Sequence, residues 1–165
     1  MDKKRFSNLT LQHGFGSPGQ GDFWWGLEKL HRLTAARRCE LRVDLAVDGV
    51  QYYQVYKDFM VWGEDRNYQI RVREPSGNAG DSMFNHTSQK HDGMQFTTKD
   101  RDNDRHSEYN CAIRFHGAWW YASCHASNLN GEWGSTAYGR GLNWYTKTGL
   151  HKSATFTEMK IKPLV

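Results

Sequence analysis

Three aspartates at alternate positions form the first group of side chains in this sequence that could bind a metal ion. They are Asp100, Asp102 and Asp104. In extended backbone alternate side chains point the same way, so these carboxylates would repel one another unless a hard cation lay between them. Calcium accepts about six to eight oxygens from carboxylates, backbone carbonyls and water. The spacing indicates a calcium site; the alternative is a solvated acidic loop neutralised by Arg101 and Arg105.

The residues around this run exclude other familiar sites. The sixth position of the run is Arg105 and the twelfth is Cys111, where an EF-hand needs glycine and glutamate. The two cysteines and two histidines within residues 111–125 match no structural zinc spacing. Cys124 and His125 are sequence neighbours, an arrangement that seldom lets a nucleophile meet its base. We therefore expect neither a zinc site nor an enzyme.

Aromatic side chains in glycine-rich loops indicate a surface for a small ligand. His125, Tyr138 and the aromatic residues near Trp144 are flat groups with polar tips. Aromatic walls with a few hydrogen-bonding groups suit small neutral or sugar-like ligands. The alternative is that Trp119, Trp120 and Trp144 belong to the core. His125 is expected either to contact a ligand or to belong to the core.

The three cysteines bear on the compartment. Cys111 and Cys124 enclose a short loop, and a disulfide there would stabilise the fold by about 3 kcal/mol. Cys39 would then be free, as a small buried apolar side chain. A disulfide implies an oxidising compartment, and the sequons at Asn8 and Asn85 agree with secretion. The N-terminus lacks the apolar segment of a signal peptide, so the chain is either intracellular or a fragment.

Composition indicates one domain with a core rich in aromatic residues. The chain has 165 residues, of which 38% are apolar, with 7 Trp, 8 Tyr and 8 Phe. The net charge is +4, but basic residues gather only in Lys3-Lys4-Arg5 and Arg37-Arg38. Nucleic-acid binding needs a larger basic face, so no nucleic-acid partner is expected. No apolar run is long enough to insert into a membrane.

The positioning elements are expected to be an antiparallel meander with a packed helix. Alternating apolar residues predict a strand over 39–48, and Asp48-Gly49 predicts a type I′ hairpin turn. Apolar spacing predicts a helix from Asp22, its cap, to Thr34. Further strands are expected over 51–59, 67–73, 94–98 and 155–162. Residues 1–21 are expected to form a loop or arm, flexible over 1–13, and residues 99–152 irregular structure that carries function.

These features resemble the fibrinogen C-terminal, or fibrinogen-related, domain family over nearly the whole chain. The matching blocks are GDFWWGLEKLHRLT (21–34), ELRVDL (40–45), GNAGDSM (77–83), FTTKDRDND (96–104), NCAIRFHGAWWYASCHASNLNG (110–131), GLNW (141–144) and FTEMKIKP (156–163). The resemblance implies an α+β fold, with a central antiparallel sheet, packed helices and a loop-rich subdomain that binds calcium and ligand. Residues 1–165 are expected to form a single such domain that lacks the family's N-terminal subdomain.

The resemblance also implies specific sites. The family's cysteine pair is matched by Cys111 and Cys124, and its calcium ligands by the side chains of Asp102 and Asp104. Backbone carbonyls at His106 and Glu108 would complete the calcium shell. In members similar to ficolins and tachylectins, an acetyl-group pocket lies beside this loop, often with a cis peptide at the second cysteine. The matching ligand-binding residues are Phe115, Ser123, Cys124, His125, Tyr138, Gly139 and Leu150, where many lectin members carry Tyr at the last of these positions.

The function implied is a secreted, calcium-dependent lectin that recognises acetylated sugars on microbial or cell surfaces in innate immunity. The alternative is a protein-interaction module, such as an angiopoietin-like receptor ligand or a clotting or matrix polymerisation domain, without a sugar pocket. Leu150 favours this alternative, while His125 and Tyr138 favour the lectin. Single sugar sites bind weakly, so the full-length protein is expected to be a homo-oligomer.

Overall fold

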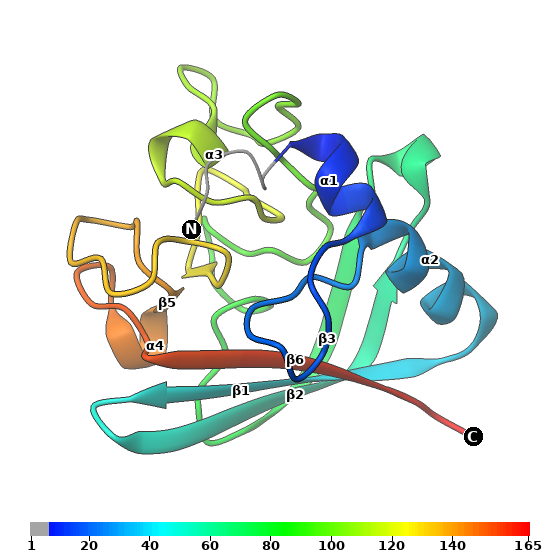
Figure 1. The fold of residues 1–165 in the computed structure, drawn as a ribbon, viewed down its shortest axis with the longest axis horizontal. Helices are drawn as coiled ribbons and strands as arrows, with labels where there is room; N and C mark the ends of the chain where they lie inside the picture. The colour runs from blue at the N-terminus through cyan, green and yellow to red at the C-terminus, as the bar shows by residue number, and fades with distance from the viewer. Residues whose placement is uncertain (1–6) are drawn as a thin grey trace.

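A four-stranded antiparallel sheet with strand order β3-β2-β1-β6 organises the computed structural model, which describes residues 7–165 (Figure 1). The strands are β1 (Cys39–Val47), β2 (Val50–Val61), β3 (Ile70–Gly77) and β6 (Phe156–Pro163). Consecutive strands β1, β2 and β3 form the expected meander. The last strand returns to pair with β1, so residues more than a hundred positions apart in the chain share one sheet, as predicted.

Strand β1 follows its apolar alternation. Leu41, Val43 and Leu45 are fully buried, whereas Arg42 between them is exposed. Asp48 and Gly49 have φ angles of 52° and 79°. Positive φ at both central residues defines the type I′ turn, which matches the twist of the strands it joins. The predicted hairpin is therefore confirmed.

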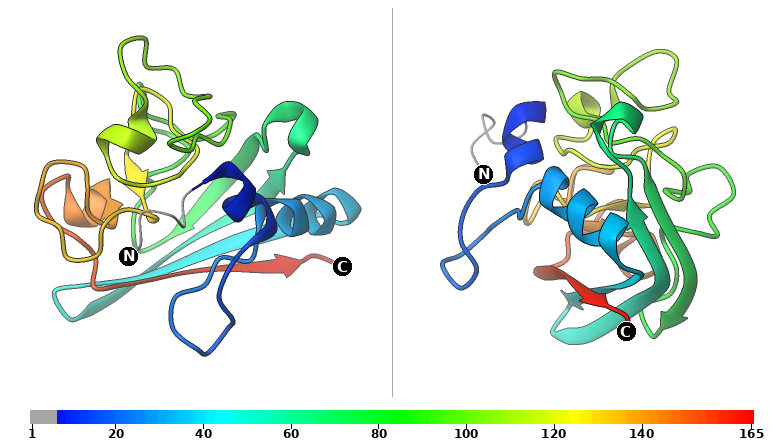
Figure 2. Two further views of the ribbon diagram at one scale, coloured as in Figure 1. Left: turned by 45° about the horizontal axis from the view of Figure 1, so that its top comes forward. Right: turned by 90° about the vertical axis from the view of Figure 1, so that its right-hand side faces the viewer.

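Two helices lie together on one side of the sheet: α1 (Asn8–His13) and α2 (Leu27–Ala36) (Figure 2). The predicted start of the second helix at Asp22 is wrong. Phe15 and Trp24 exchange two backbone hydrogen bonds, which hold Trp24 in an extended bridge instead of a helical turn. The helix therefore begins only after Gly26, its N-cap.

The expected flexible arm over residues 1–13 is wrong for residues 8–13. These residues form α1, whose Leu11 is fully buried in the core. Ser7 caps the helix by accepting a hydrogen bond from the Thr10 N–H, and the Asn8 N–H donates to Asp100 Oδ1 over 2.9 Å. The rest of the arm, residues 1–6, lies outside the described part of the chain.

Between β3 and β6 the chain runs through a long segment with little regular structure. The short elements on the way from β2 to β6 are η2 (Glu64–Arg66), α3 (Cys111–Arg114), β4 (Ser127–Asn128), β5 (Asn143–Trp144) and α4 (Tyr145–Thr148). The predicted strand over 94–98 is not formed, because only isolated bridges join Thr97 to Trp119 and Thr98 to Arg101. Strand β3 also begins later than predicted, since Asn67 and Tyr68 have positive φ.

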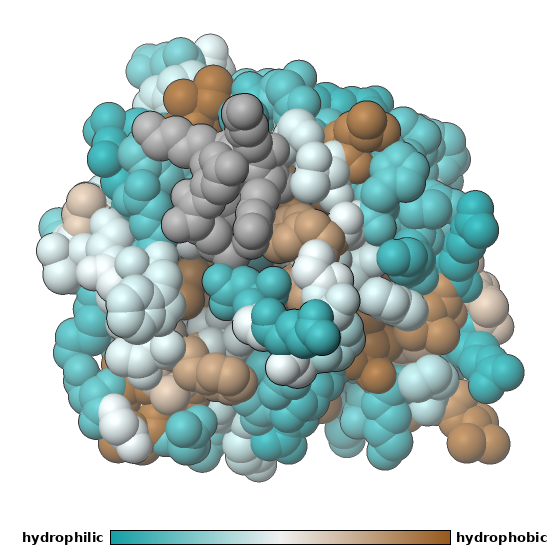
Figure 3. All heavy atoms as spheres, in the orientation of Figure 1, coloured by the Kyte–Doolittle hydropathy of each residue, from teal (hydrophilic) through white to brown (hydrophobic). Residues whose placement is uncertain are grey.

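The irregular segment is held by a core of aromatic residues. Trp119, Trp120 and Trp144 are fully buried and join the same apolar cluster as the sheet, so the core interpretation holds for each of them. On the face shown in Figure 3, the apolar residues lie in several separate places among polar ones. Within residues 7–165, none of the helices has the length and apolar character needed to span a membrane.

Candidate functional site

The two cysteines that flank the tryptophan pair form a disulfide. Cys111 begins α3, whose N-terminus is capped by the Asn110 side chain, and it is joined to Cys124 with 5.7 Å between the Cα atoms. The disulfide is therefore confirmed. Cys39 is free and buried in the core on β1, as predicted.

Two of the three aspartates in the acidic loop lie together. The Asp104 carboxylate accepts hydrogen bonds from the backbone N–H groups of His106 and Cys111, both over 2.8 Å, and the Asp104 N–H donates to Asp102 Oδ1 over 3.2 Å. Burial raises the pKa of Asp104 to about 6; the nearby Asp102 carboxylate adds to this rise, and the two N–H donors oppose it. The loop therefore holds two carboxylates whose charges disfavour each other, which suits a bound cation.

The third aspartate is not part of this pair, so the expectation that all three carboxylates face one another is wrong. Asp100 instead accepts hydrogen bonds from the Asn8 N–H and the Thr98 hydroxyl. Asp100 is turned away from the pair by a tertiary contact, because α1 lies against the start of the acidic loop. Among the described residues, no group of three or more His, Cys, Asp or Glu side chains could hold a metal ion, so further ligands would have to be backbone oxygens or water.

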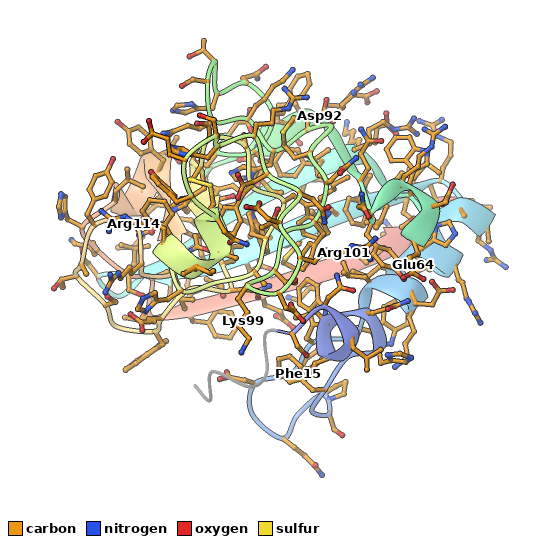
Figure 4. The ribbon with its side chains drawn as sticks, turned by 90° about the horizontal axis from the view of Figure 1, so that it is seen from above. Phe15, Glu64, Asp92, Lys99, Arg101 and Arg114 are labelled. Carbon is orange, nitrogen blue, oxygen red and sulfur yellow. A yellow bond between two sulfur atoms is a disulfide. The ribbon has the colours of Figure 1, made fainter. Side chains whose placement is uncertain are left out.

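The acidic loop also offers backbone carbonyl oxygens, and one of its expected counterions, Arg101, pairs elsewhere. The carbonyl oxygens of His106 and Glu108 accept no hydrogen bond within residues 7–165, and the His106 ring stacks on Tyr109. Arg101 turns away and pairs with Glu64, at 3.6 Å between Arg101 Nη1 and Glu64 Oε1 (Figure 4). The donor set therefore fits calcium, and its occupancy remains a prediction.

A small recess opens beside the disulfide and the acidic loop. Its volume is about 100 Å³. Its lining residues are Gln89, Tyr109, Phe115, Ser123, Cys124, His125, Tyr138 and Leu150. The fold thus brings six of the seven predicted ligand-binding residues around one hollow. The seventh, Gly139, lies directly behind it, because its carbonyl oxygen accepts a hydrogen bond from His125 Nε2 over 2.9 Å.

His125 is held as a neutral imidazole. Its side chain is almost completely buried, and its ring meets Phe115 edge to face with 4.8 Å between the ring centres. Burial lowers the pKa of His125 to about 3; nearby His91 adds to this shift, and the Gly139 carbonyl opposes it. Since Nε2 donates to Gly139, Nδ1 is an acceptor, and no partner for it lies within the described chain.

The backbone around the second cysteine contains N–H groups that donate no hydrogen bond within the described chain. The Ser123–Cys124 peptide bond is cis, as the resemblance implied, and the Ala122 N–H donates to the Cys124 carbonyl oxygen. For the N–H groups of Cys124 and His125, residues 7–165 contain no hydrogen-bond acceptor. Two backbone donors therefore belong to residues that line the recess.

Two buried side chains that the sequence did not point to hold these walls in place. Asn128 Nδ2 donates to the carbonyl oxygens of Phe115 and Gly139, each over 3.2 Å. His91 Nδ1–H donates to the Trp120 carbonyl, while its Nε2 accepts the N–H groups of residues 126 and 127. Asn128 lies within the polar turn after the disulfide, which was the only signal for it, and His91 had none.

Comparisons with known proteins agree with this architecture. A family model described as "Fibrinogen beta and gamma chains, C-terminal globular domain" matches residues 5–164. Fibrinogen C domain-containing protein 1-B of Xenopus laevis is 46% identical over an alignment of 159 residues, which covers 91% of this chain and 33% of that protein. Tenascin-R of Mus musculus is 41% identical over 152 residues, which are 92% of this chain and 11% of that protein. The chain spans a third or less of the length of these relatives.

Solved structures share the fold. The fibrinogen-like globe domain of human ANGPTL2 has a TM-score of 0.87 at 36% identity, covering 96% of this chain and 73% of that one. Lamprey fibrin D-dimer, complexed with the peptide ligand Gly-His-Arg-Pro-amide, has a TM-score of 0.87 at 30% identity, covering 95% of this chain and 56% of that one. The predicted α+β architecture is confirmed.

Proposed function

Since the chain belongs to the family of fibrinogen C-terminal globular domains, we propose that it is a calcium-dependent, lectin-like recognition module for acetylated sugars. In this proposal the full-length protein is secreted and oligomeric, and it presents the recess to glycans on microbial or cell surfaces in innate defence. No bond is made or broken in this function.

The observation that carries the proposal is the pairing of unused backbone donors with aromatic walls. An acetamido group has one strongly accepting carbonyl oxygen and one methyl group. The N–H groups of Cys124 and His125 could donate to the oxygen, while Phe115 and Tyr138 could enclose the methyl. Pockets for whole small molecules usually measure about 300–1,000 Å³. A recess of about 100 Å³ therefore suits one substituent of a sugar better than the whole ring.

The acidic loop supports the recess through the chain itself. Asp104 holds the N–H of Cys111, and Cys111 is bonded to Cys124 in the recess wall. Calcium held by Asp102 and Asp104 would cross-link the two carboxylates and the backbone around them. A loop that is anchored in this way keeps Tyr109, which lines the recess, in one place.

The alternative function is recognition of a protein or peptide. It is favoured by the similarity to tenascin-R and by the peptide bound in lamprey fibrin D-dimer. That peptide carries an arginine and is cationic. The recess of this chain has no carboxylate among its described lining residues, so it offers a cationic group no ion-pair partner. Leu150 supports the alternative, because it supplies no hydroxyl to the recess.

Retention on a resin bearing N-acetylglucosamine tests the proposal. The full chain would be loaded in calcium and then washed with a chelator, next to a His125→Ala variant whose folding is verified by circular dichroism. We expect retention that is lost in chelator and lost in the variant. If a folded, calcium-loaded protein passes straight through the resin, the acetyl-lectin proposal fails and the protein-interaction alternative takes its place.

A further inference from the structure

A second and larger hollow borders α3. This groove has a volume of about 670 Å³, within the usual range for small-molecule sites. Its lining residues are Lys99, Ala112, Ile113, His116, Gly117, Gly131, Glu132, Trp133, Gly134 and Ser135. None of them was assigned to a site above.

One wall of the groove is an exposed but anchored tryptophan. The Trp133 side chain is 70% exposed, whereas Trp119, Trp120 and Trp144 are fully buried. Its Nε1–H donates to the Thr155 carbonyl oxygen over 3.0 Å, which fixes the plane of the ring. An anchored indole loses little further freedom when a ligand stacks on it, and its negatively polarised face attracts polarised C–H groups.

The polar groups of the groove form a set of donors and acceptors with balanced charge. His116 Nδ1 lies 2.7 Å from Glu132 Oε1, and both side chains are partly exposed. The Glu132 N–H donates to the Arg140 carbonyl, which holds the backbone of this residue. Lys99 supplies a positive charge to the same lining and projects outward from its loop (Figure 4). A charged ligand would therefore meet both a positive and a negative side chain in the groove.

The geometry points to a binding site for a neutral pyranose ring of an oligosaccharide. A pyranose has an apolar C–H face, which would lie on Trp133, and a rim of hydroxyls, which would bond to Glu132 and His116. Gly134 leaves room for such a ring close to the backbone, because a Cβ added there would have no atom within 4 Å. An ionic ligand fits the balanced charges poorly, and a purely apolar ligand would take the paired Glu132 and His116 side chains out of water without offering them a hydrogen bond.

The groove and the recess border the same short segments. Phe115 lines the recess and its neighbour His116 lines the groove, while residues 131–135 border the groove and Tyr138 borders the recess. The inference deepens the proposed function by adding a subsite for a second sugar unit. It rests on that function only for the idea that both positions serve one glycan.

Indole ¹⁵N–¹H resonances of the full chain test the groove directly. Trp133→Phe identifies the Trp133 signal, and cellotriose and chitotriose serve as probes without and with acetyl groups. We expect both sugars to shift this signal, and Trp133→Ala to weaken binding of cellotriose about tenfold, as the loss of one stacking contact predicts. Trp25→Ala is the matched control, since Trp25 is 44% exposed and lies outside the groove lining.

The outcomes separate the groove from the recess. With His125→Ala, the Trp133 signal is expected to respond to cellotriose as in the unchanged chain. A Trp133 signal that stays still with both sugars, or equal loss of cellotriose binding in the Trp25 and Trp133 variants, overturns the inference. Failure of the recess would appear instead as unchanged backbone signals of Cys124 and His125 with chitotriose, whatever Trp133 does.

Discussion

At the scale of single residues, Gly139 determines whether the recess has room for a ligand. It has a φ of +70°, and a Cβ added there would lie 2.6 Å from the Phe115 ring. Gly19, which lines neither hollow, has a similar φ of +81° but no atom within 4 Å of an added Cβ. The two glycines therefore separate the conformational effect of a side chain from its steric effect.

We predict that Gly139→Ala abolishes binding of N-acetylglucosamine, because the new methyl forces Phe115 into the recess. Both Gly139→Ala and Gly19→Ala carry the cost of a left-handed backbone, about 1–2 kcal/mol of unfolding free energy. Isothermal titration would measure sugar binding, and urea unfolding would measure stability. Equal sugar affinity in the two variants would contradict the assignment of Gly139 to the wall of the recess.

Single-residue assignments were predictable where local sequence carried them. The family resemblance of the block around Cys124 predicted Ser123 and His125 beside the hollow, and the structure shows them there, next to the disulfide. Gln89 also lines the hollow, but its loop reaches it only through turns that no local pattern specifies. Asp100 was misplaced for the same kind of reason, since its partner Asn8 is 92 positions away.

At the scale of elements, the acidic loop is the part whose role depends on a ligand. Its two carboxylates are adjacent, and the buried one has a raised pKa. Regular strands were predictable because alternation of buried and exposed residues recurs along β1. The loop was predictable only as a set of ligands, since its backbone path depends on hydrogen bonds that the Asp104 carboxylate accepts from the N–H groups of His106 and Cys111.

We predict that calcium raises the melting temperature of the chain and that Asp102→Asn removes this rise. The substitution takes away one of the two adjacent charges while leaving the Asp104 hydrogen bonds to residues 106 and 111 in place. Asp100→Asn is the control, because Asp100 binds Asn8 and Thr98 instead. Differential scanning calorimetry with and without calcium would measure the shift. A full calcium response in Asp102→Asn would refute the calcium site.

At the scale of the whole molecule, buried histidines couple stability to pH. His91 is completely buried and ties residues 120, 126 and 127 to the loop after β3. Burial lowers the pKa of His91 from 6.5 to about 4; the Trp120 carbonyl opposes the shift. Between these values the unfolded chain binds more protons than the folded one, so the stability present above pH 6.5 is lost as the pH falls towards 4.

We predict that this single group lowers the free energy of unfolding by up to about 3 kcal/mol between neutral pH and pH 4. Urea unfolding across this range would show the slope, and His91→Gln should reduce it. Direct titration of the His91 ring by NMR is a second measurement in case the variant does not fold. A ring that titrates near 6.5 would contradict the buried neutral state.

The fold as a whole followed from pattern and family resemblance together. The meander and the returning β6 were predictable because alternation identifies strands that share a sheet. The start of α2 was not, since the bridge between Phe15 and Trp24 that delays it joins two segments with no strand pattern. Helix α1 was missed for a related reason: its one fully buried residue, Leu11, contacts a core built from later parts of the chain.

The central claim is that the backbone of Cys124 and His125 donates to an acetyl group. The most direct measurement is the backbone amide spectrum of the calcium-loaded full chain during titration with N-acetylglucosamine, with glucosamine as the matched sugar without the acetyl group. The account predicts saturable shifts of the Cys124 and His125 amides with the acetylated sugar alone. Amides that stay still in a folded chain, or that move equally with both sugars, would contradict it.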